Sequence, residues 1–131
     1  MKWGLDTNTL IYFFKGEGRV AEELLSRSPA DIGIPAIALF ELQVGIAKSS
    51  SPQKRSQQLR ELLNVVDVIE FDDHAAQAAA NVRAVLENRG TPIGPYDLLI
   101  AGSVLARGLT LVSRNSGEFS RVEGLRLENC Y

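Results

Sequence analysis

Three acidic side chains occur where the neighbouring residues are apolar. Asp6 ends the short run KWGLD, Glu41 lies within IPAIALFELQVGIAKSS, and Asp97 lies within GPYDLLIAG. Burying an unpaired carboxylate is so costly that the group takes up a proton instead, unless a nearby charge compensates it. Each of these positions therefore needs a chemical or a structural explanation.

Metal binding is the chemical explanation. Carboxylates that are brought together repel each other strongly unless a cation lies between them. Hard divalent ions with oxygen ligands suit such a group, and Mg²⁺ is typically held by one or two carboxylates together with substrate phosphate. Asp6, Glu41 and Asp97 thus indicate metal-assisted hydrolysis of a phosphodiester.

Asp6 and Asp97 also have ordinary structural explanations. Asp6 precedes TNT at the start of a predicted helix, where an aspartate caps the helix by accepting hydrogen bonds from free backbone amides. If Pro95 is the first helical residue, Asp97 lies in the first turn, where the helix dipole favours an anion. Against this explanation, the residues at helical spacing after Asp97 are apolar and predict a core-facing position for it: Ile100, Ala101, Val104 and Leu105.

Glu41 is surrounded by small and apolar residues on its own helical face. The positions three and four residues away are Ile37, Ala38, Val44 and Gly45. A solvated glutamate would normally lie on the polar side of the helix, so this position predicts a compensating cation. The alternative is that this helical face is partly exposed to solvent and that Glu41 forms an ion pair with Lys48 or Arg107.

Further polar side chains lie beside the predicted strand ends. Ser113, Asn115 and Glu118 lie at or just beyond the end of a strand over 109–113, and Thr7 and Asn8 directly follow Asp6. We expect Glu118 to be a fourth acid of the site, although a solvated loop position is the ordinary one for a glutamate. The other four are predicted to orient ligands or water through hydrogen bonds.

The elements that position these residues alternate along the chain. Apolar runs predict strands over 2–6, 32–35, 65–71, 109–113 and 125–128, and helical periodicity predicts helices over 8–15, 18–27, 36–49, 52–64, 73–89 and 95–107. Such alternation implies an α/β fold with a mainly parallel sheet covered on both faces. Ligands bind such sheets beyond the carboxyl ends of the strands, where we expect the acids to meet.

The overall composition narrows the class of protein. A chain of 131 residues suits a single domain over 1–131, and no apolar run approaches the ~20 residues of a membrane span. The first residues lack the features of a secretory signal, which predicts a cytoplasmic protein. The net charge of −2 gives no broad attraction to nucleic acid, although acids gathered at one metal site would leave the remaining surface near neutral.

The single cysteine, the single histidine and the absence of two motifs argue against several kinds of site. One cysteine, Cys130, and one histidine, His74, rule out an internal disulfide and a Cys/His zinc site within the chain. His74 lies in the acidic start of a helix and no GxSxG turn is present, which disfavours a Ser/His/Asp hydrolase. GEGR at 16–19 neither follows a strand nor ends as a P-loop does, so a nucleotide cofactor is not expected.

Four motifs in order resemble the PIN-domain family, and more narrowly the VapC-type toxin ribonucleases of bacterial toxin–antitoxin pairs. They are LDTN with Asp6, FELQVG with Glu41, GPYDLLIAG with Asp97, and LVSRNSGEF with Asn115 and Glu118. The resemblance extends over essentially the whole chain, including the closing RVEGLRLENC. It is much more specific than any one motif alone.

The resemblance implies a three-layer α/β/α sandwich with a central, mainly parallel, five-stranded sheet. It also implies that Asp6, Glu41 and Asp97 bind Mg²⁺ or Mn²⁺, with Glu118 at the place where many members have a fourth acid. Other members have an aspartate at the position of Asn115, which leaves the fourth ligand open. The implied partners are an RNA substrate, a cognate antitoxin whose disordered arm folds over the active-site groove, and a second copy of the chain; the run LIYFF at 10–14 suits either protein contact or the core.

Two other functions use the same residues. A PIN-like fold could bind RNA or a partner without cutting, although retention of all three principal acids disfavours this. A structure-specific DNA nuclease would use the same metal chemistry, but 131 residues leave little room for helices that clamp duplex ends. The sequence therefore favours cleavage of single-stranded or loop RNA by a metal-activated water.

Overall fold

The computed structural model describes all 131 residues and contains a five-stranded sheet at its centre. Its strands, all parallel, are ordered β3-β2-β1-β4-β5. Their bounds are β1 Trp3–Leu5, β2 Ile32–Pro35, β3 Asp67–Ile69, β4 Thr110–Val112 and β5 Arg126–Glu128. The innermost strand, β1, pairs with β2 on one side and β4 on the other, so the residue after β1 lies in the middle of the sheet edge.

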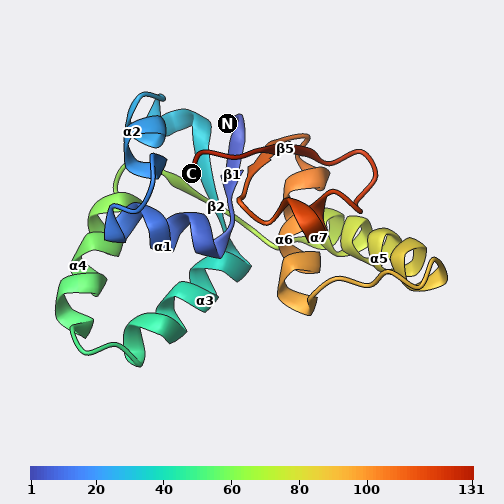
Figure 1. The fold of residues 1–131 in the computed structure, drawn as a ribbon, viewed down its shortest axis with the longest axis horizontal. Coiled ribbons are helices and arrows are strands. Elements are labelled where there is room, and N and C mark those ends of the chain that lie inside the picture. Colours follow the sequence, from blue (N-terminus) through green and yellow to red (C-terminus); the bar gives the residue numbers. More distant parts are fainter.

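Seven helices connect the strands and cover both faces of the sheet. They are α1 Thr7–Lys15, α2 Val20–Leu25, α3 Ala36–Ala47, α4 Pro52–Leu63, α5 Asp73–Asn88, α6 Pro95–Ala106 and α7 Ser116–Phe119, with a 3₁₀ turn at Pro29–Asp31. Parallel strands are joined by right-handed crossovers, so connections that run in opposite directions across a sheet cover opposite faces. Figure 1 shows this division, with α1 to α4 on one side of the sheet and α5 to α7 on the other. The predicted α/β/α sandwich is confirmed.

One predicted strand and one connection differ from the sequence expectation. The run 65–71 forms only the three residues of β3, whose first two residues are exposed. Val65 belongs to the turn after α4 and is 56% exposed, and Val68 is 38% exposed because β3 is an edge strand that is not covered on both faces. The segment after β4 contains the short helix α7, which was not predicted.

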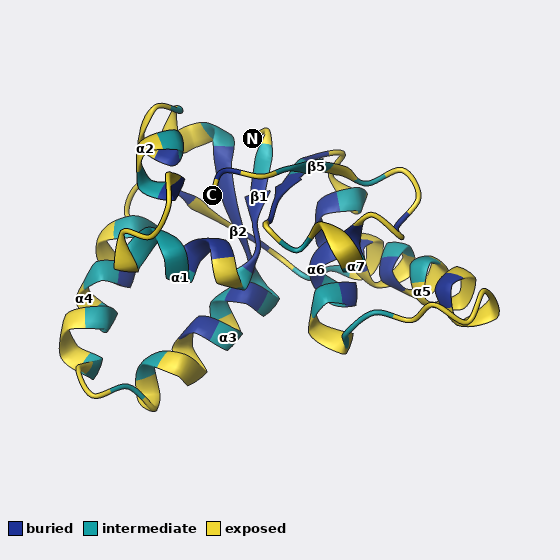
Figure 2. Cartoon of the chain, viewed as in Figure 1, coloured by how far each residue is buried: buried dark blue, intermediate teal, exposed yellow.

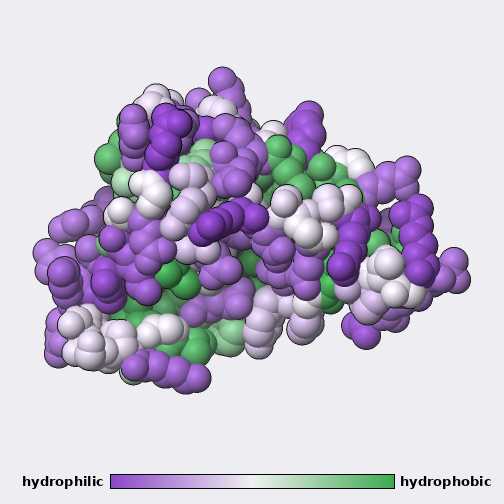
Figure 3. Space-filling view, in the orientation of Figure 1, coloured by the Kyte–Doolittle hydropathy of each residue, from purple (hydrophilic) through white to green (hydrophobic).

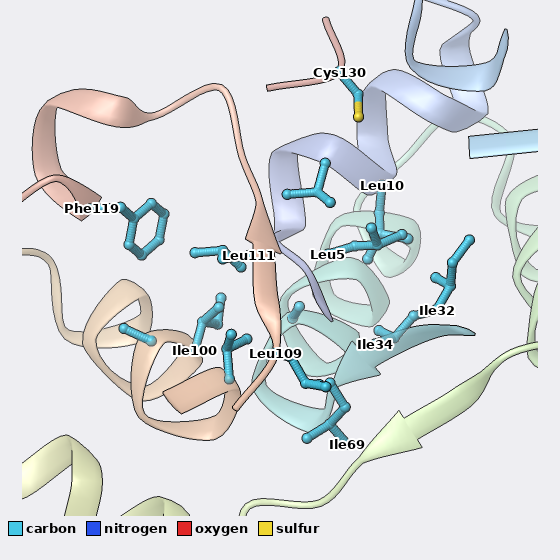
Figure 4. Packing of buried hydrophobic residues seen from close by; sticks show 14 of the residues in the cluster. Leu5, Leu10, Ile32, Ile34, Ile69, Ile100, Leu109, Leu111, Phe119 and Cys130 are labelled. Carbon is cyan, nitrogen blue, oxygen red and sulfur yellow. The ribbon is translucent and has the colours of Figure 1, made fainter. Parts of the chain in front are cut away.

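The buried core lies on both faces of the sheet. Figure 2 shows the three inner strands β1, β2 and β4 largely buried and the outward helix faces exposed. In Figure 4, Leu5 and Leu10 pack on the α1 side of β4, while Ile100 and Phe119 pack on the α6 side; all four are at most 1% exposed. None of the helices is both long and apolar enough to cross a membrane.

Close packing of α6 on α5 depends on Gly102. A Cβ atom at this position would lie 2.6 Å from the Ala79 Cβ and 2.9 Å from the Ala75 carbonyl oxygen. Such distances are far below van der Waals contact, so only glycine allows the two helices to approach this closely. This contact fixes α6, the helix whose first turn carries Asp97.

Candidate active site

The carboxyl ends of β1 and β4 form the point where the strand order changes direction. From β1 the chain proceeds to β2 and β3 on one side, and β4 and β5 fill the other side. Connections leave such a point toward opposite faces, which opens a crevice beyond the strand ends. Asp6 follows β1 and Ser113 follows β4, so both lie at this crevice.

Asp6 is almost completely buried and tightly held. Its side chain is N-cap of α1, with Oδ1 accepting from the Thr9 backbone amide at 2.9 Å, so the capping explanation is correct. Oδ2 accepts from the Ser113 hydroxyl at 2.6 Å. A carboxylate has about four acceptor positions, so these two bonds leave lone pairs for a further ligand. Capping and metal binding are therefore compatible at Asp6.

Glu41 faces α1 across the crevice. The Thr7 hydroxyl donates to Glu41 Oε1 at 2.7 Å, and neither Lys48 nor Arg107 forms a salt bridge with it. Arg107 instead lies 3.9 Å from Asp72. The predicted apolar surroundings are only half correct, because Val44 is 39% exposed where the outer part of α3 leaves the core. Glu41 is therefore half-buried and has no cationic partner.

Asp97 and Glu118 approach each other from two different helices. Asp97 lies in the first turn of α6, whose first residue is Pro95 as predicted, and Glu118 lies in α7 rather than in a loop. The Asn115 side-chain amide reaches both carboxylates, at 3.5 Å from Asp97 Oδ2 and 3.4 Å from Glu118 Oε2. A Cβ atom on Gly94 would lie within 4 Å of the same two oxygens. These two acids therefore share one small region.

The ionisation of Asp97 is influenced by the other three acids. Partial burial raises the pKa of Asp97 to about 7, assisted by a shared hydrogen bond with Glu118 and by the negative charges of Glu118, Asp6 and Glu41. The same hydrogen bond lowers the pKa of Glu118. Charges act on Asp97 in this way only when they are nearby, so Glu118, Asp6 and Glu41 all lie in the neighbourhood of Asp97.

Of the remaining predicted residues, Ser113 and Asn115 contact the acids and Asn8 does not. Ser113 Oγ both donates to Asp6 and accepts from the Asn115 backbone amide at 2.9 Å. Ser113 therefore connects Asp6 with the segment that carries Asn115 and Glu118. Asn115 also caps α7, accepting from the Glu118 amide at 3.4 Å. Asn8 is exposed and makes no side-chain hydrogen bond to these acids, so the structure gives it no positioning contact.

The side chains as they stand do not form a closed metal site. No group of three or more Asp, Glu, His or Cys side chains has the arrangement of one. Convergence of Asp6, Glu41 and Asp97 on one common ion therefore stays a prediction. The donor set nevertheless fits a hard divalent cation, because it consists of oxygen atoms, and none of the four acids forms a salt bridge with lysine or arginine.

A groove extends from Glu41 between α1, α3 and α4. Its apolar lining includes Ile11, Phe14, Leu42 and Ile46, with Lys15 and Arg55 at its border. Hydrophobic atoms are visible between these helices in Figure 3. The run 10–14 therefore divides its roles, since Leu10 is core whereas Ile11 and Phe14 face the groove. The sequence alone did not predict this division.

Comparison with known proteins identifies the family. The PIN domain family model matches residues 5–125. The chain is 36% identical over 129 residues to the tRNA(fMet)-specific endonuclease VapC of Salmonella typhimurium, covering 98% of each chain. It is 35% identical over 132 residues to Ribonuclease VapC2 of Haemophilus influenzae, again covering 98% of each chain. The chain belongs to the VapC group of PIN-domain proteins.

Solved structures agree with membership of the VapC group. The chain superposes on the VapC-type chain of DNA-bound VapBC from Salmonella typhimurium with a TM-score of 0.93 and 35% identity, covering 100% of this chain and 99% of that one. For VapBC2 from Rickettsia felis, bound to a promoter DNA fragment, the TM-score is 0.88 with 35% identity and 98% coverage of each chain. The family and fold predicted from the four motifs are both confirmed.

Proposed function

We propose that this PIN-domain protein is a Mg²⁺- or Mn²⁺-dependent endoribonuclease that cuts single-stranded or loop RNA and acts in the cytoplasm as the toxin of a toxin–antitoxin pair. The observation that carries the proposal is the position of Asp97. Partial burial, a hydrogen bond with Glu118 and the negative charges of Glu118, Asp6 and Glu41 raise its pKa to about 7, beside the crevice where the strand order reverses. The names of the VapC relatives, an endonuclease and a ribonuclease, support the same activity.

Asp6, Glu41 and Asp97 would hold the ion, with Glu118 as a fourth acid. When bound, a divalent ion lowers the pKa of a coordinated water and neutralises charge on the phosphoryl and leaving oxygens. The Thr7 and Ser113 hydroxyls orient Glu41 and Asp6 through their hydrogen bonds, which fixes where free lone pairs point. Asn115 positions Asp97 and Glu118 from one amide group.

We propose two protein partners from the same family membership. Related structures are VapBC toxin–antitoxin complexes, so a cognate antitoxin is expected to bind this chain as well. The groove that begins at Glu41 has apolar walls suited to a segment that folds as it binds, and occupation of this groove would also block access to the acids. The second partner is another copy of the chain, giving a homodimer.

The experiment is cleavage of labelled RNA and DNA oligonucleotides of the same sequence by purified protein, with Mn²⁺, Mg²⁺ or EDTA. We expect cleavage of RNA only, and only with a divalent ion. Asp6→Ala and Asp97→Ala should each lower the rate by more than ~100-fold, because loss of even an outer-shell partner of a metal ligand costs about 10- to 100-fold.

Asp73→Ala is the matched control, since this exposed aspartate lies in the first turn of α5. It should cleave as wild type does. Cleavage of both polymers would favour the DNA nuclease alternative, and RNA binding without any cleavage would favour the binding-module alternative. Undiminished cleavage by Asp6→Ala or Asp97→Ala in preparations free of wild-type protein would refute the assignment of these acids.

A further inference from the structure

Arg114 is a cation at the border of the candidate active site that has no assigned role. It lies directly between Ser113, which donates to Asp6, and Asn115, which reaches Asp97 and Glu118. Its side chain is exposed and forms no salt bridge, although both of its sequence neighbours contact acids of the site. The positive charge of Arg114 is thus available to an anion from outside the chain.

Two aromatic rings lie against the Arg114 side chain. Its guanidinium carbon lies 3.6 Å from the Tyr131 ring centroid and 5.9 Å from that of Tyr12. The two rings meet edge to face, with centroids 4.9 Å apart. Stacking on an aromatic face orients a guanidinium while leaving its N–H groups free to donate. The arginine is therefore positioned before any ligand arrives.

Tyr131 is itself fixed by contacts from distant parts of the chain. The Arg19 backbone amide donates to the Tyr131 carbonyl oxygen at 2.9 Å. Gly18 lies so close to Tyr131 that a Cβ atom there would be 2.9 Å from its oxygen and 3.0 Å from its ring. The preceding residue, Cys130, is buried and accepts from Arg27 at 3.3 Å. The ring beneath Arg114 is thus anchored to the turn between α1 and α2.

We infer that Arg114, supported by Tyr131, binds the RNA backbone at a phosphate next to the one that is cut; this inference rests on the proposed endoribonuclease function. A planar guanidinium matches two phosphate oxygens, and a cation beside an aromatic pair is the usual composition of a single-strand binding site. The position one residue from Ser113 and from Asn115 places this subsite beside the acids, and the ring contacts orient a guanidinium that forms no salt bridge with them. Arg114 contacts substrate, and Tyr131 is a positioning residue.

The test measures binding and cleavage separately. Fluorescence anisotropy with a labelled single-stranded RNA is carried out in Ca²⁺, and cleavage kinetics are measured in Mn²⁺. Arg114→Ala should weaken binding about 10-fold at low salt and reduce the slope of log affinity against log salt by about 0.7, the value for one phosphate contact on a single strand. KM should rise while kcat changes little, because the contact is present before and during the reaction.

Three further variants make the result specific. Arg60→Ala is the matched control, because Arg60 is an exposed arginine on α4 that also forms no salt bridge. Tyr131→Leu should weaken RNA binding as Arg114→Ala does, and Tyr131→Phe, which keeps the ring, should restore most of the affinity. Far-ultraviolet circular dichroism and thermal unfolding identify any variant that has lost its fold.

The outcomes separate this inference from the proposed function. Equal losses for Arg114→Ala and Arg60→Ala, or wild-type affinity and salt slope for Arg114→Ala, would overturn the subsite while RNA cleavage by the wild type still stood. A wild-type protein that neither binds nor cuts RNA would remove the proposed function and the subsite together. A loss of affinity in Tyr131→Phe equal to that in Tyr131→Leu would contradict the positioning role of the ring.

Discussion

The two halves of the candidate site are held in different ways. Asp6 is 3% exposed and accepts two short bonds, from the Thr9 amide and the Ser113 hydroxyl. Asp97 and Glu118 share a hydrogen bond with each other, the Asn115 amide makes only long contacts with them, and the pKa of Asp97 is raised to about 7. In the first half, the protein's own hydrogen-bond donors satisfy the Asp6 carboxylate. In the second half, Asp97 and Glu118 together carry more negative charge than the surrounding groups compensate.

This difference assigns separate roles to folding and to ligand binding. The Thr9 donor belongs to the first turn of α1 and the Ser113 donor is brought to Asp6 when β1 and β4 pair, so the position of Asp6 is determined by the fold. The Asp97–Glu118 pair is stabilised either by a proton or by a cation. We therefore expect the Asp6 half to respond to mutation mainly through stability and geometry, and the other half mainly through pH and divalent ions.

The largest expected effect is the loss of stability when Phe119, which anchors the helix carrying Glu118, is truncated. Phe119 follows Glu118 and is completely buried, so Phe119→Ala should lower the free energy of unfolding by about 3–5 kcal/mol. Urea denaturation measures the change. Phe40→Ala is the control, because Phe40 is 47% exposed and should cost about 1 kcal/mol or less. Equal losses in the two variants would show that α7 is not anchored through Phe119.

The next largest effect is the loss of RNA cleavage when the hydrogen-bond donor of either half, Ser113 or Asn115, is removed. Ser113→Ala removes the 2.6 Å bond to Asp6 and should lower RNA cleavage by about 10- to 100-fold. Asn115→Ala removes only contacts of 3.4 to 3.5 Å and should lower it less. Ser120→Ala serves as the control, since Ser120 is exposed and bonds only to the Gly117 carbonyl. A larger loss for Asn115→Ala than for Ser113→Ala would reverse the comparison.

Removal of one acid from each half should change stability in opposite directions. Asp6→Ala loses a helix cap and should destabilise the protein by about 1 kcal/mol. Asp97→Asn removes a charge that is repelled by its neighbours, so in EDTA at pH 8 it should raise the melting temperature. Differential scanning calorimetry in EDTA measures both. Destabilisation by Asp97→Asn under these conditions would mean that the repulsion around Asp97 is already compensated.

The smallest effect is a dependence on pH without divalent ions. Asp97 binds its proton more tightly in the folded protein, where its pKa is about 7, than in the unfolded chain, where the ordinary value is about 3.8. Its contribution to stability is therefore complete below about pH 3.8 and is lost as the pH rises through 7. Urea denaturation in EDTA at pH 6 and pH 8 should give a smaller pH effect in Asp97→Asn than in wild type. The same pH effect in both proteins would contradict the assignment to Asp97.

Sequence reasoning found the acids more reliably than their surroundings. Asp6 was predictable because a strand end in a parallel sheet has a fixed place, and that place is set by local pattern. Glu41 was predicted from an apolar stripe along its helix, but the outer part of that stripe is exposed at Val44. Helical periodicity does not reveal how far a helix extends beyond the core. The helix α7 is four residues long, too short to show a period, and it depends on the Asn115 cap and on burial of Phe119. The contact of Arg114 with Tyr131 joins residues from separate elements, so no local pattern predicts it.

The bond between Ser113 and Asp6 joins residues that are 107 positions apart in the chain. During synthesis the N-terminal residues emerge first, and Asp6 cannot receive this bond until β4 has been made and has paired beside β1. The residues of helices α1 to α4 and strands β1 to β3 are synthesised well before that moment. A growing chain thus has Asp6 and Glu41 long before it has Ser113 and Glu118, so the crevice of the candidate site can be completed only near the end of translation.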